Sequence, residues 1–276
     1  MSEQQGEMSF LGHLEVLRWT LIRSTLAVFV GGLVAFLMKD FIFNQILLAP
    51  KDPSFFTYRF LCSVSKSLGT EGLCIDEIPF IVQSRTMAGQ FSAHIWTSIA
   101  FGFVMAFPYV IWEVWKFIKP ALYDSEKKNA RSFIIVTSFL FFLGIFFGYF
   151  VITPLSINFL GSYSVAEEVK NNFDLSSYTG LLKASCLSSG FIFELPIIIY
   201  FLTKMGLVTP EFLRTYRKYA LVLVLILAAI ITPPDIISQI IVAIPMVILY
   251  EVSIKISKFI IRKQEKEANK ELIKKS

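Results

Sequence analysis

The sequence predicts an all-α integral membrane protein built from six membrane-crossing helices. Three observations lead to this fold class: an apolar composition, six apolar stretches, and an unequal distribution of basic residues. Of the 276 residues, 55% are hydrophobic, 28 are phenylalanine and only 17% are charged. Soluble domains have about 25% charged residues, so we expect no separate soluble domain in this chain.

Six apolar stretches are the candidate helices, because about 20 helical residues are needed to cross roughly 30 Å of hydrocarbon. They cover about residues 19–38, 87–118, 132–152, 175–203, 220–231 and 236–250. The second and fourth contain Pro108 and Pro196, so we expect them to be tilted or kinked. The fifth and sixth are too short for a straight crossing, and the turn Thr232-Pro233-Pro234-Asp235 joins them.

Lysine and arginine set the expected orientation. Nineteen of the 26 basic residues fall near the N-terminus, in the connections after the second and fourth helices, and after Glu251. The other seven fall on the opposite side of the predicted membrane. The positive-inside rule therefore places both termini in the cytoplasm. We predict one polytopic membrane domain over residues 1–276, in which residues 251–276 form a basic cytoplasmic tail.

Two of the three cysteines lie in the first predicted external loop. Cys62 and Cys74 have eleven residues between them, outside the reducing cytoplasm, which favours a disulfide. A bridge would stabilise the fold by about 3 kcal/mol through the entropy of the unfolded loop. Two unpaired thiols are the alternative. Cys186 lies inside the fourth helix, where a small packing residue is expected.

No common catalytic or nucleotide-binding motif occurs in the sequence. It contains no HExxH, no GxSxG and no phosphate-binding glycine loop. The predicted topology separates His13 from His94 by the width of the membrane, so the two cannot form one metal site within a chain. The sequence therefore predicts a protein that is not an enzyme and that needs neither a metal nor a cofactor.

Two acidic residues lie in the predicted spans. Glu194 lies deep in the fourth, where a carboxylate costs at least about 2.5 kcal/mol and must face protein, water or a partner. It is either a binding or proton-sensitive group on a concave face, or a satisfied packing carboxyl beside Pro196. Glu113 lies between Trp112 and Trp115 near the membrane interface, where we expect water to reach it.

The hairpin between the last two apolar stretches carries three polar residues. Gln239 lies within the sixth stretch, and side-chain amides bridge helices in membranes. It either pairs within the chain or holds a helix of another protein. Thr232 and Asp235 cap the hairpin and give it a polar outer edge.

Four stretches together resemble the TatC family, the multi-span receptor subunits of the twin-arginine (Sec-independent) protein translocase. They are His13-Leu14-Glu15-Val16-Leu17-Arg18, Trp115-Lys116-Phe117-Ile118-Lys119-Pro120-Ala121-Leu122-Tyr123 with the later Glu126, Phe193-Glu194-Leu195-Pro196, and Thr232-Pro233-Pro234-Asp235-Ile236-Ile237-Ser238-Gln239. The last is the most specific. The resemblance extends from Ser9 to about Phe259.

The resemblance implies a fold, a location and a function. It implies six helices in a cupped, glove-like arrangement in the bacterial inner membrane, with both termini cytoplasmic. The implied function is a receptor for signal peptides that bear paired arginines on folded cargo proteins. The receptor is also expected to be the core assembly platform of a translocase driven by the proton-motive force, forming homo- and hetero-oligomers with TatA- and TatB-type single-span proteins.

The resemblance also implies which residues bind the signal peptide. Glu126 matches the acid of the family's first cytoplasmic loop, and Phe117, Pro120 and Leu122 match the segment before it. Arg18 matches an arginine near the N-terminus. The family pattern there is His-Leu-x-Glu-Leu-Arg, whereas this chain has Val16 in the fourth position and Glu15 before it. Carboxylates bind the planar guanidinium in a bidentate manner, so Glu15 is expected to be the second arginine ligand.

The remaining matches concern partners and structure. Thr232 and Gln239 match the polar positions expected to contact TatA and TatB, and Glu194 matches the acid of the concave face. Pro50 and Asp235 match structural positions. The main alternative function is a small-solute or ion secondary transporter with Glu194 as its coupling group. A third, an intramembrane enzyme, lacks the necessary chemistry.

Overall fold

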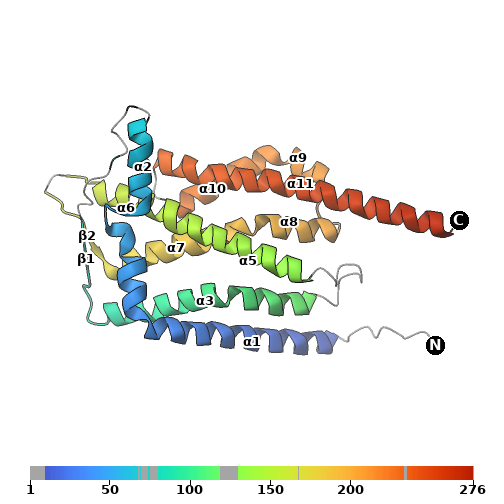
Figure 1. Cartoon of the computed structure of the whole chain (residues 1–276), viewed down its shortest axis with the longest axis horizontal. Helices are drawn as coiled ribbons and strands as arrows, with labels where there is room; N and C mark the ends of the chain where they lie inside the picture. Colours follow the sequence, from blue (N-terminus) through green and yellow to red (C-terminus); the bar gives the residue numbers. More distant parts are fainter. Residues whose placement is uncertain are drawn as a thin grey trace. The chain divides into compact units, whose positions relative to one another are not determined.

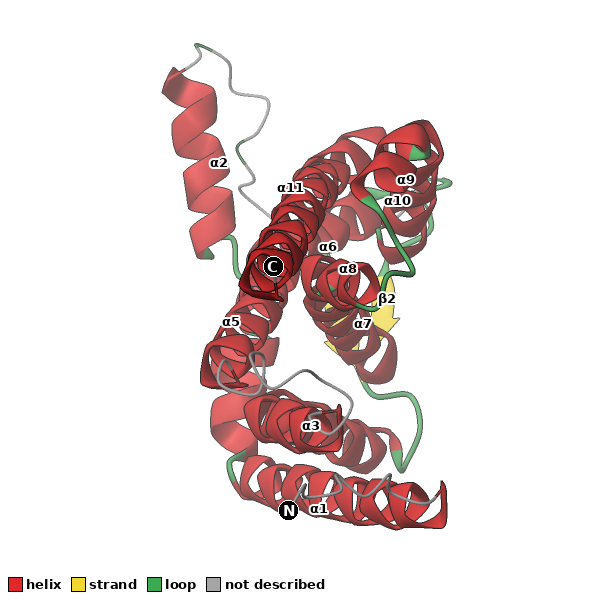
Figure 2. Cartoon of the chain, turned by 90° about the vertical axis from the view of Figure 1, so that its right-hand side faces the viewer, coloured by secondary structure: helices red, strands yellow, loops and turns green. Residues whose placement is uncertain are grey.

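The computed structural model describes residues 10–67, 69, 74, 80–118, 130–166, 168–232 and 235–275. Most of this described chain is helical, and Figure 2 shows how little of it is strand. The all-α fold class is confirmed. The chain divides into two compact units, one of Met1–Gln45 with Thr86–Phe139 and one of Ile46–Arg85 with Leu140–Ser276.

The first unit contains two long helices that lie side by side, α1 (Phe10–Leu37) and α3 (Gly89–Ile118) (Figure 1). Their backbones approach closely where glycine faces glycine. A Cβ atom on Gly102 would lie 2.3 Å from the backbone nitrogen of Gly32 and 2.6 Å from the carbonyl oxygen of Val28. Small residues permit such packing in lipid, where apolar side chains gain nothing by leaving the bilayer.

The first part of α5 completes this unit, and the π-helix η1 begins in it. The second unit holds the rest of both elements and all the others. The bounds are η1 (Phe41–Leu47), η2 (Ala49–Lys51), α2 (Phe56–Ser67), β1 (Ile81–Gln83), α5 (Ala130–Phe147), η4 (Gly148–Ile152), α6 (Thr153–Ser162), β2 (Asn172–Asp174), α7 (Leu175–Phe193), α8 (Leu195–Lys204), α9 (Pro210–Thr215), α10 (Arg217–Ile231) and α11 (Ile236–Lys275).

In the second unit, α5 and the π-helix η4 pack on α7 through glycine. A Cβ atom on Gly144 would lie 2.6 Å from the carbonyl oxygen of Ser189, and one on Gly148 would lie 2.7 Å from the Cα of Cys186. Cys186, a free cysteine, therefore lies at a tight helix contact.

Helix α11 packs on α8 and α10. A cluster of buried apolar side chains joins α10 and α11 to η4; it consists of Ile152, Val224, Ala228, Val242, Ala243 and Met246. Near the middle of α11, the Thr203 hydroxyl donates a hydrogen bond of 2.9 Å to the Ser257 hydroxyl in a buried position. This pairing provides a hydrogen-bond partner within the protein, because lipid cannot supply one.

Three tyrosine hydroxyls bind the end of η1 and the residues just after it. Tyr58 donates to the carbonyl oxygens of Pro50 at 2.9 Å and Pro154 at 3.2 Å. Tyr149 donates to Ile46 and Tyr178 to Leu47, each at 2.8 Å. Burial raises the pKa of Tyr58, which keeps this donor protonated.

Beyond this segment lie the disulfide and the two strands. Cys62 and Cys74 are joined by a disulfide. The sequence had left open whether the two thiols are bridged or unpaired. Strand β1 pairs with β2 in parallel, with Val82 opposite Phe173. The Arg85 guanidinium donates a hydrogen bond of 2.7 Å to the carbonyl oxygen of Asn172. This bond adds a side-chain contact to the pairing of the two strands.

Asp174 links these strands to the start of α7. Its carboxylate accepts hydrogen bonds from the Ser176 hydroxyl, from the backbone N–H of Ser176 at 2.9 Å and from that of Arg85 at 3.1 Å. These bonds, led by the Ser176 hydroxyl, lower the pKa of Asp174. The charged carboxylate is therefore retained as the N-cap of the helix.

Two predicted helices differ from the structure. The stretch predicted at 236–250 continues to Lys275 as one helix of 40 residues, so most of the predicted tail 251–276 is helical. Helix α11 continues because Ile254 and Ile260 are buried and because the lysines and glutamates beyond them favour helix. The prediction that this helix is short is wrong.

The predicted count of six crossings is not confirmed. Five helices in the described part are long and apolar enough to cross a membrane: Leu14–Leu37, Gly89–Ile118, Arg131–Ser162, Leu175–Lys204 and Ser238–Lys266. The stretch predicted at 220–231 lies in α10, whose 15 residues reach only about 22 Å. The count of six crossings is therefore not reproduced.

Pro108 and Pro196 have different effects on their helices. Helix α3 runs through Pro108 without a break, because other groups can satisfy the carbonyl that a proline leaves free in a membrane helix. The fourth predicted helix ends at Phe193 and restarts at Leu195, so it is interrupted just before Pro196, as expected for a proline in the first turn of a helix.

We expect Gly102→Ala to lower the free energy of unfolding by about 1–3 kcal/mol, the usual cost of overpacking, because the new methyl group meets the backbone of α1. Thermal unfolding of the protein in detergent measures the change. Gly180→Ala is the matched control, since a Cβ there meets nothing within 4 Å. Equal stability of the two variants would contradict the backbone contact.

We expect maleimide–polyethylene glycol to modify neither Cys62 nor Cys74 in the native protein without reductant, and to modify both after reduction, because the disulfide holds both thiols. Gel mobility measures the number of added groups. In denaturant without reductant, Cys186 should react and serve as the internal control. Reaction at Cys62 in the unreduced, denatured protein would show that the bridge is absent.

Candidate functional site

Near its N-terminal end, α1 presents an acid and a base on its surface. The Glu15 carboxylate lies 3.7 Å from a guanidinium nitrogen of Arg18 and accepts a hydrogen bond of 2.9 Å from the Trp19 indole. The side chains of Arg18 and Glu15 are 63% and 56% exposed. An exposed ion pair contributes little to stability, so this one can be exchanged for another partner. The structure thus brings the predicted residues Glu15 and Arg18 together.

The other predicted signal-peptide residues lie at and beyond the end of α3. Phe117 is half-buried in the last turn of this helix. Pro120, Leu122 and Glu126 lie outside the described residues. The helix ends that flank this segment are in contact, since the buried Trp115 stacks on Phe133 of α5 with ring centroids 4.6 Å apart.

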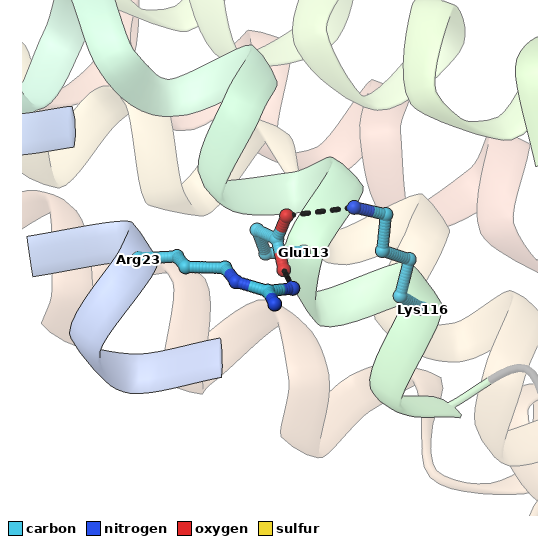
Figure 3. A network of polar contacts seen from close by, with 3 residues as sticks. All are labelled: Arg23, Glu113 and Lys116. Atoms are coloured by element: carbon cyan, nitrogen blue, oxygen red, sulfur yellow. Dashed lines mark hydrogen bonds and ion pairs between the residues drawn. The ribbon is translucent and has the colours of Figure 1, made fainter. Parts of the chain in front are cut away.

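Glu113 is the residue whose importance the sequence reasoning missed. It is 1% exposed, so the expectation that water reaches it is wrong. One carboxylate oxygen lies 2.8 Å from the Lys116 ammonium, and the other lies 3.7 Å from the Arg23 guanidinium of α1 (Figure 3). The ammonium also lies 3.5 Å from the centroid of the Trp112 ring, a cation–π contact.

Part of this network could have been found in the sequence. Glu113 and Lys116 are three residues apart on a helix, and such pairs face each other. Arg23 could not have been found, because its contact depends on the packing of α1 against α3.

Glu194 lies at the break between α7 and α8 and is 7% exposed. Neither carboxyl oxygen has a hydrogen bond of normal geometry in the described part of the chain, and the backbone of Phe141 is the polar group that approaches the carboxyl. A buried polar group without a well-formed hydrogen bond is costly, which makes this carboxyl a candidate for binding or proton exchange.

The polar residues of the hairpin form hydrogen bonds within the chain. Asp235 accepts 2.8 Å and 2.7 Å bonds from the backbone N–H and hydroxyl of Ser238 and so caps α11. The Thr232 hydroxyl donates to the carbonyl oxygen of Ala228 at 2.8 Å. The Gln239 amide donates a hydrogen bond of 3.1 Å to the carbonyl oxygen of Leu225. Gln239 therefore has a partner within the chain, which was one of the two predictions for this residue.

The hairpin also presents an apolar face. Beside these polar residues, α10 exposes several large side chains, which are Val222, Leu223, Leu225, Ile226 and Ile230. Among the described residues, no group of three or more His, Cys, Asp or Glu side chains lies close enough to hold a metal ion. His94 instead lies 3.0 Å from the carbonyl oxygen of Phe36 and stacks on its ring.

Known proteins resemble this chain in sequence over most of its length. Residues 12–245 match the family model described as Sec-independent protein translocase protein (TatC). A protein of that name from Blattabacterium sp. subsp. Periplaneta americana is 41% identical over 266 residues, covering 96% of this chain and 100% of the relative. Another, from Desulforapulum autotrophicum, is 35% identical over 257 residues, covering 92% and 86%.

A solved structure agrees with these relatives. The crystal structure of a protein described as the twin arginine translocase receptor TatC matches with a TM-score of 0.67 and 31% identity. The match covers 90% of this chain and 99% of the other. The chain therefore belongs to the TatC family, and is a multi-pass membrane component of a Sec-independent protein translocase, a transport protein rather than an enzyme.

Proposed function

We propose that this chain is the receptor for twin-arginine signal peptides within its translocase. The observation that carries the proposal is the exposed Glu15–Arg18 pair at the start of α1, in a chain similar to a solved protein described as the twin arginine translocase receptor. A twin-arginine motif requires acids that are accessible to guanidinium groups and only weakly committed to partners of their own.

Two acids are proposed to bind the paired arginines. A guanidinium forms two parallel bonds with a carboxylate, a geometry that lysine cannot reproduce. Glu126 would bind one arginine from the segment between α3 and α5. Glu15 would bind the other by exchanging its contact with Arg18, even though Val16 occupies the position at which the family has its acid. Phe117, Pro120 and Leu122 would line the same site.

This function requires the site to face the cytoplasm. The distribution of lysine and arginine supports an orientation with both termini on that side, and we propose this orientation in the bacterial inner membrane. The binding residues then meet signal peptides before their folded cargo has crossed. The proton-motive force is the proposed energy source.

We further propose that α10 and its junction with α11 bind single-span TatA- and TatB-type partners. The apolar face of α10 is exposed, and its 15 residues are too few to match the bilayer without a neighbour. The bond from Gln239 to Leu225 fixes α10 on α11 and so presents this face. Thr232 lies at the end of the same helix. Assembly into homo- and hetero-oligomers would follow.

A small-solute or ion secondary transporter is the second candidate. It is favoured by Glu194, a buried acid without a hydrogen bond of normal geometry in the described residues, at a helix break of the kind that transporters use for substrate sites. It predicts no interaction with a signal peptide, so the crosslinking experiment below distinguishes the two functions.

We expect Glu126→Ala to lower photo-crosslinking of a twin-arginine signal peptide by about tenfold, because a charge-assisted hydrogen bond is worth roughly 1.5–3 kcal/mol. Glu126→Lys should lower it further by repelling the guanidinium groups. The crosslink yield in membranes measures both effects, with a photoreactive residue in the peptide. Glu168→Lys, on the opposite predicted side, is the control and should match the parent. Unchanged yields in both Glu126 variants would remove this residue from the site.

We expect Gln239→Leu to lower co-purification of a TatA-type partner about threefold, the effect of an interhelical amide bond of about 0.6 kcal/mol. Quantitative immunoblotting of the partner after detergent extraction measures it. Ile244→Leu, at an exposed position on the same helix, is the control. Full recovery of the partner with the Gln239 variant would contradict a role for this amide in assembly.

A further inference from the structure

Beyond residue 250, α11 has one face that packs on the protein and one face that no described element covers. The packed face contacts α8 and α9 (Figure 1), and its buried positions are Ser253, Ile254, Ser257 and Ile260. The exposed positions recur at intervals of three and four residues, which is the spacing of one helix face. They are Val252, Lys255, Phe259, Arg262 and Lys266. We call these five residues the basic face of α11.

The cations of the basic face lack counterions within the chain. Among the residues that the structure describes, no acid forms an ion pair with Lys255 or Arg262. Glu251, one turn before Lys255, is already neutralised by the Arg217 guanidinium at 2.6 Å. Glu265 is the other acid near this face, and it is exposed. The face therefore keeps a net positive charge that an anionic partner can neutralise.

An exposed aromatic side chain lies among these cations. Phe259 is 70% exposed, with Lys255 one turn before it and Arg262 one turn after it. Leaving a phenylalanine in water forgoes the favourable free energy of burying it, whereas the boundary of a bilayer accepts an aromatic ring beside basic residues. Helix faces that bind anionic lipid surfaces have this combination of residues.

The place of the basic face along α11 fits a membrane surface. Counted from the start of the helix at Ile236, about 20 residues cross the hydrocarbon, which brings its boundary close to Lys255. The next two turns then lie at the level of the headgroups. Thr203 of α8 bonds to Ser257, so the neighbouring Lys204 brings a further cation to this level.

We propose that the basic face of α11 binds the headgroups of anionic phospholipids. Arg262 can grip a phosphate group through two parallel hydrogen bonds, and Lys255 and Lys266 attract phosphate as point charges. Phe259 enters the boundary between the headgroups and the acyl chains. Lipid then covers this side of α11, while α8 and α9 cover the other. The inference goes beyond the receptor function and does not depend on it.

The test uses the full-length protein in vesicles that contain equal amounts of phosphatidylglycerol and phosphatidylcholine. A photoreactive benzoylphenylalanine replaces Phe259, and mass spectrometry quantifies the adducts of each lipid. In this parent, we expect adducts of the anionic lipid to be about 20-fold in excess. Lys255→Gln and Arg262→Gln should each lower this ratio about fivefold, the effect of one basic residue near an anionic surface. The double variant should bring the ratio close to one.

Two matched variants and a change of salt serve as controls. Lys255→Arg keeps the positive charge and should leave the ratio within about twofold of the parent. Lys170→Gln makes the same chemical change as Lys255→Gln at an exposed residue between α6 and β2, and it should leave the ratio unchanged. Salt at about 1 M shortens the Debye length to about 3 Å, so it should remove most of the excess.

Three outcomes would overturn the proposal. Equal adducts of the two lipids in the parent would mean that the face contacts lipid without recognising its charge. Adducts with neither lipid would mean that the face lies away from the membrane surface, next to water, an acidic protein segment or a nucleic acid. An excess of the anionic lipid that persists in the double variant would mean that the selectivity does not come from Lys255 and Arg262.

Discussion

Hydrocarbon provides no hydrogen-bond partner for a peptide group, and this constraint determines the rest of the structure. Every backbone segment at membrane depth must satisfy itself, which leaves the helix as the available form. Because lipid is as apolar as leucine, the helices then need another reason to associate. Here they do so through backbone contacts at glycine, as at Gly102 against Gly32 and at Gly148 against Cys186. Polar side chains add direction to these contacts, as in the pair of Thr203 with Ser257.

The two buried acids show how differently this constraint can be met. Glu113 is enclosed by two cations and therefore acts as a fixed part of the scaffold. Glu194 is buried at a helix break without a hydrogen bond of normal geometry from the described residues. An unpaired carboxyl in such a place is retained at a cost to stability, which is why it is the better candidate for a changing interaction with water, a proton or a partner. Exposed acids such as Glu15 are the ones free to exchange partners during recognition.

Much of the fold could be predicted, because hydropathy and charge act locally. Five of the six predicted stretches lie in helices long and apolar enough to cross a membrane, and four of these helices start within two residues of the predicted position. The error in the last helix arose at residue 250, where apolar character ends but helix propensity does not. The buried positions Ser253, Ser257 and Ile260 recur at intervals of four and three residues, which is the spacing of one helix face. The candidate site was found mainly through resemblance to a family, since Glu126 and its neighbours resemble ordinary solvated charges.

The sequence by itself determined that this protein lies in a membrane, where its long apolar helices are, and which family it belongs to. These properties depend on residue type and spacing along one chain. Only the tertiary structure decided which polar groups meet: Arg23 with Glu113, Gln239 with Leu225, and the three tyrosines with the segment from Ile46 to Pro50. The physical reason is that a partner far along the chain is set by how helices pack. Because packing depends on backbone contacts at small residues, it has almost no local signature.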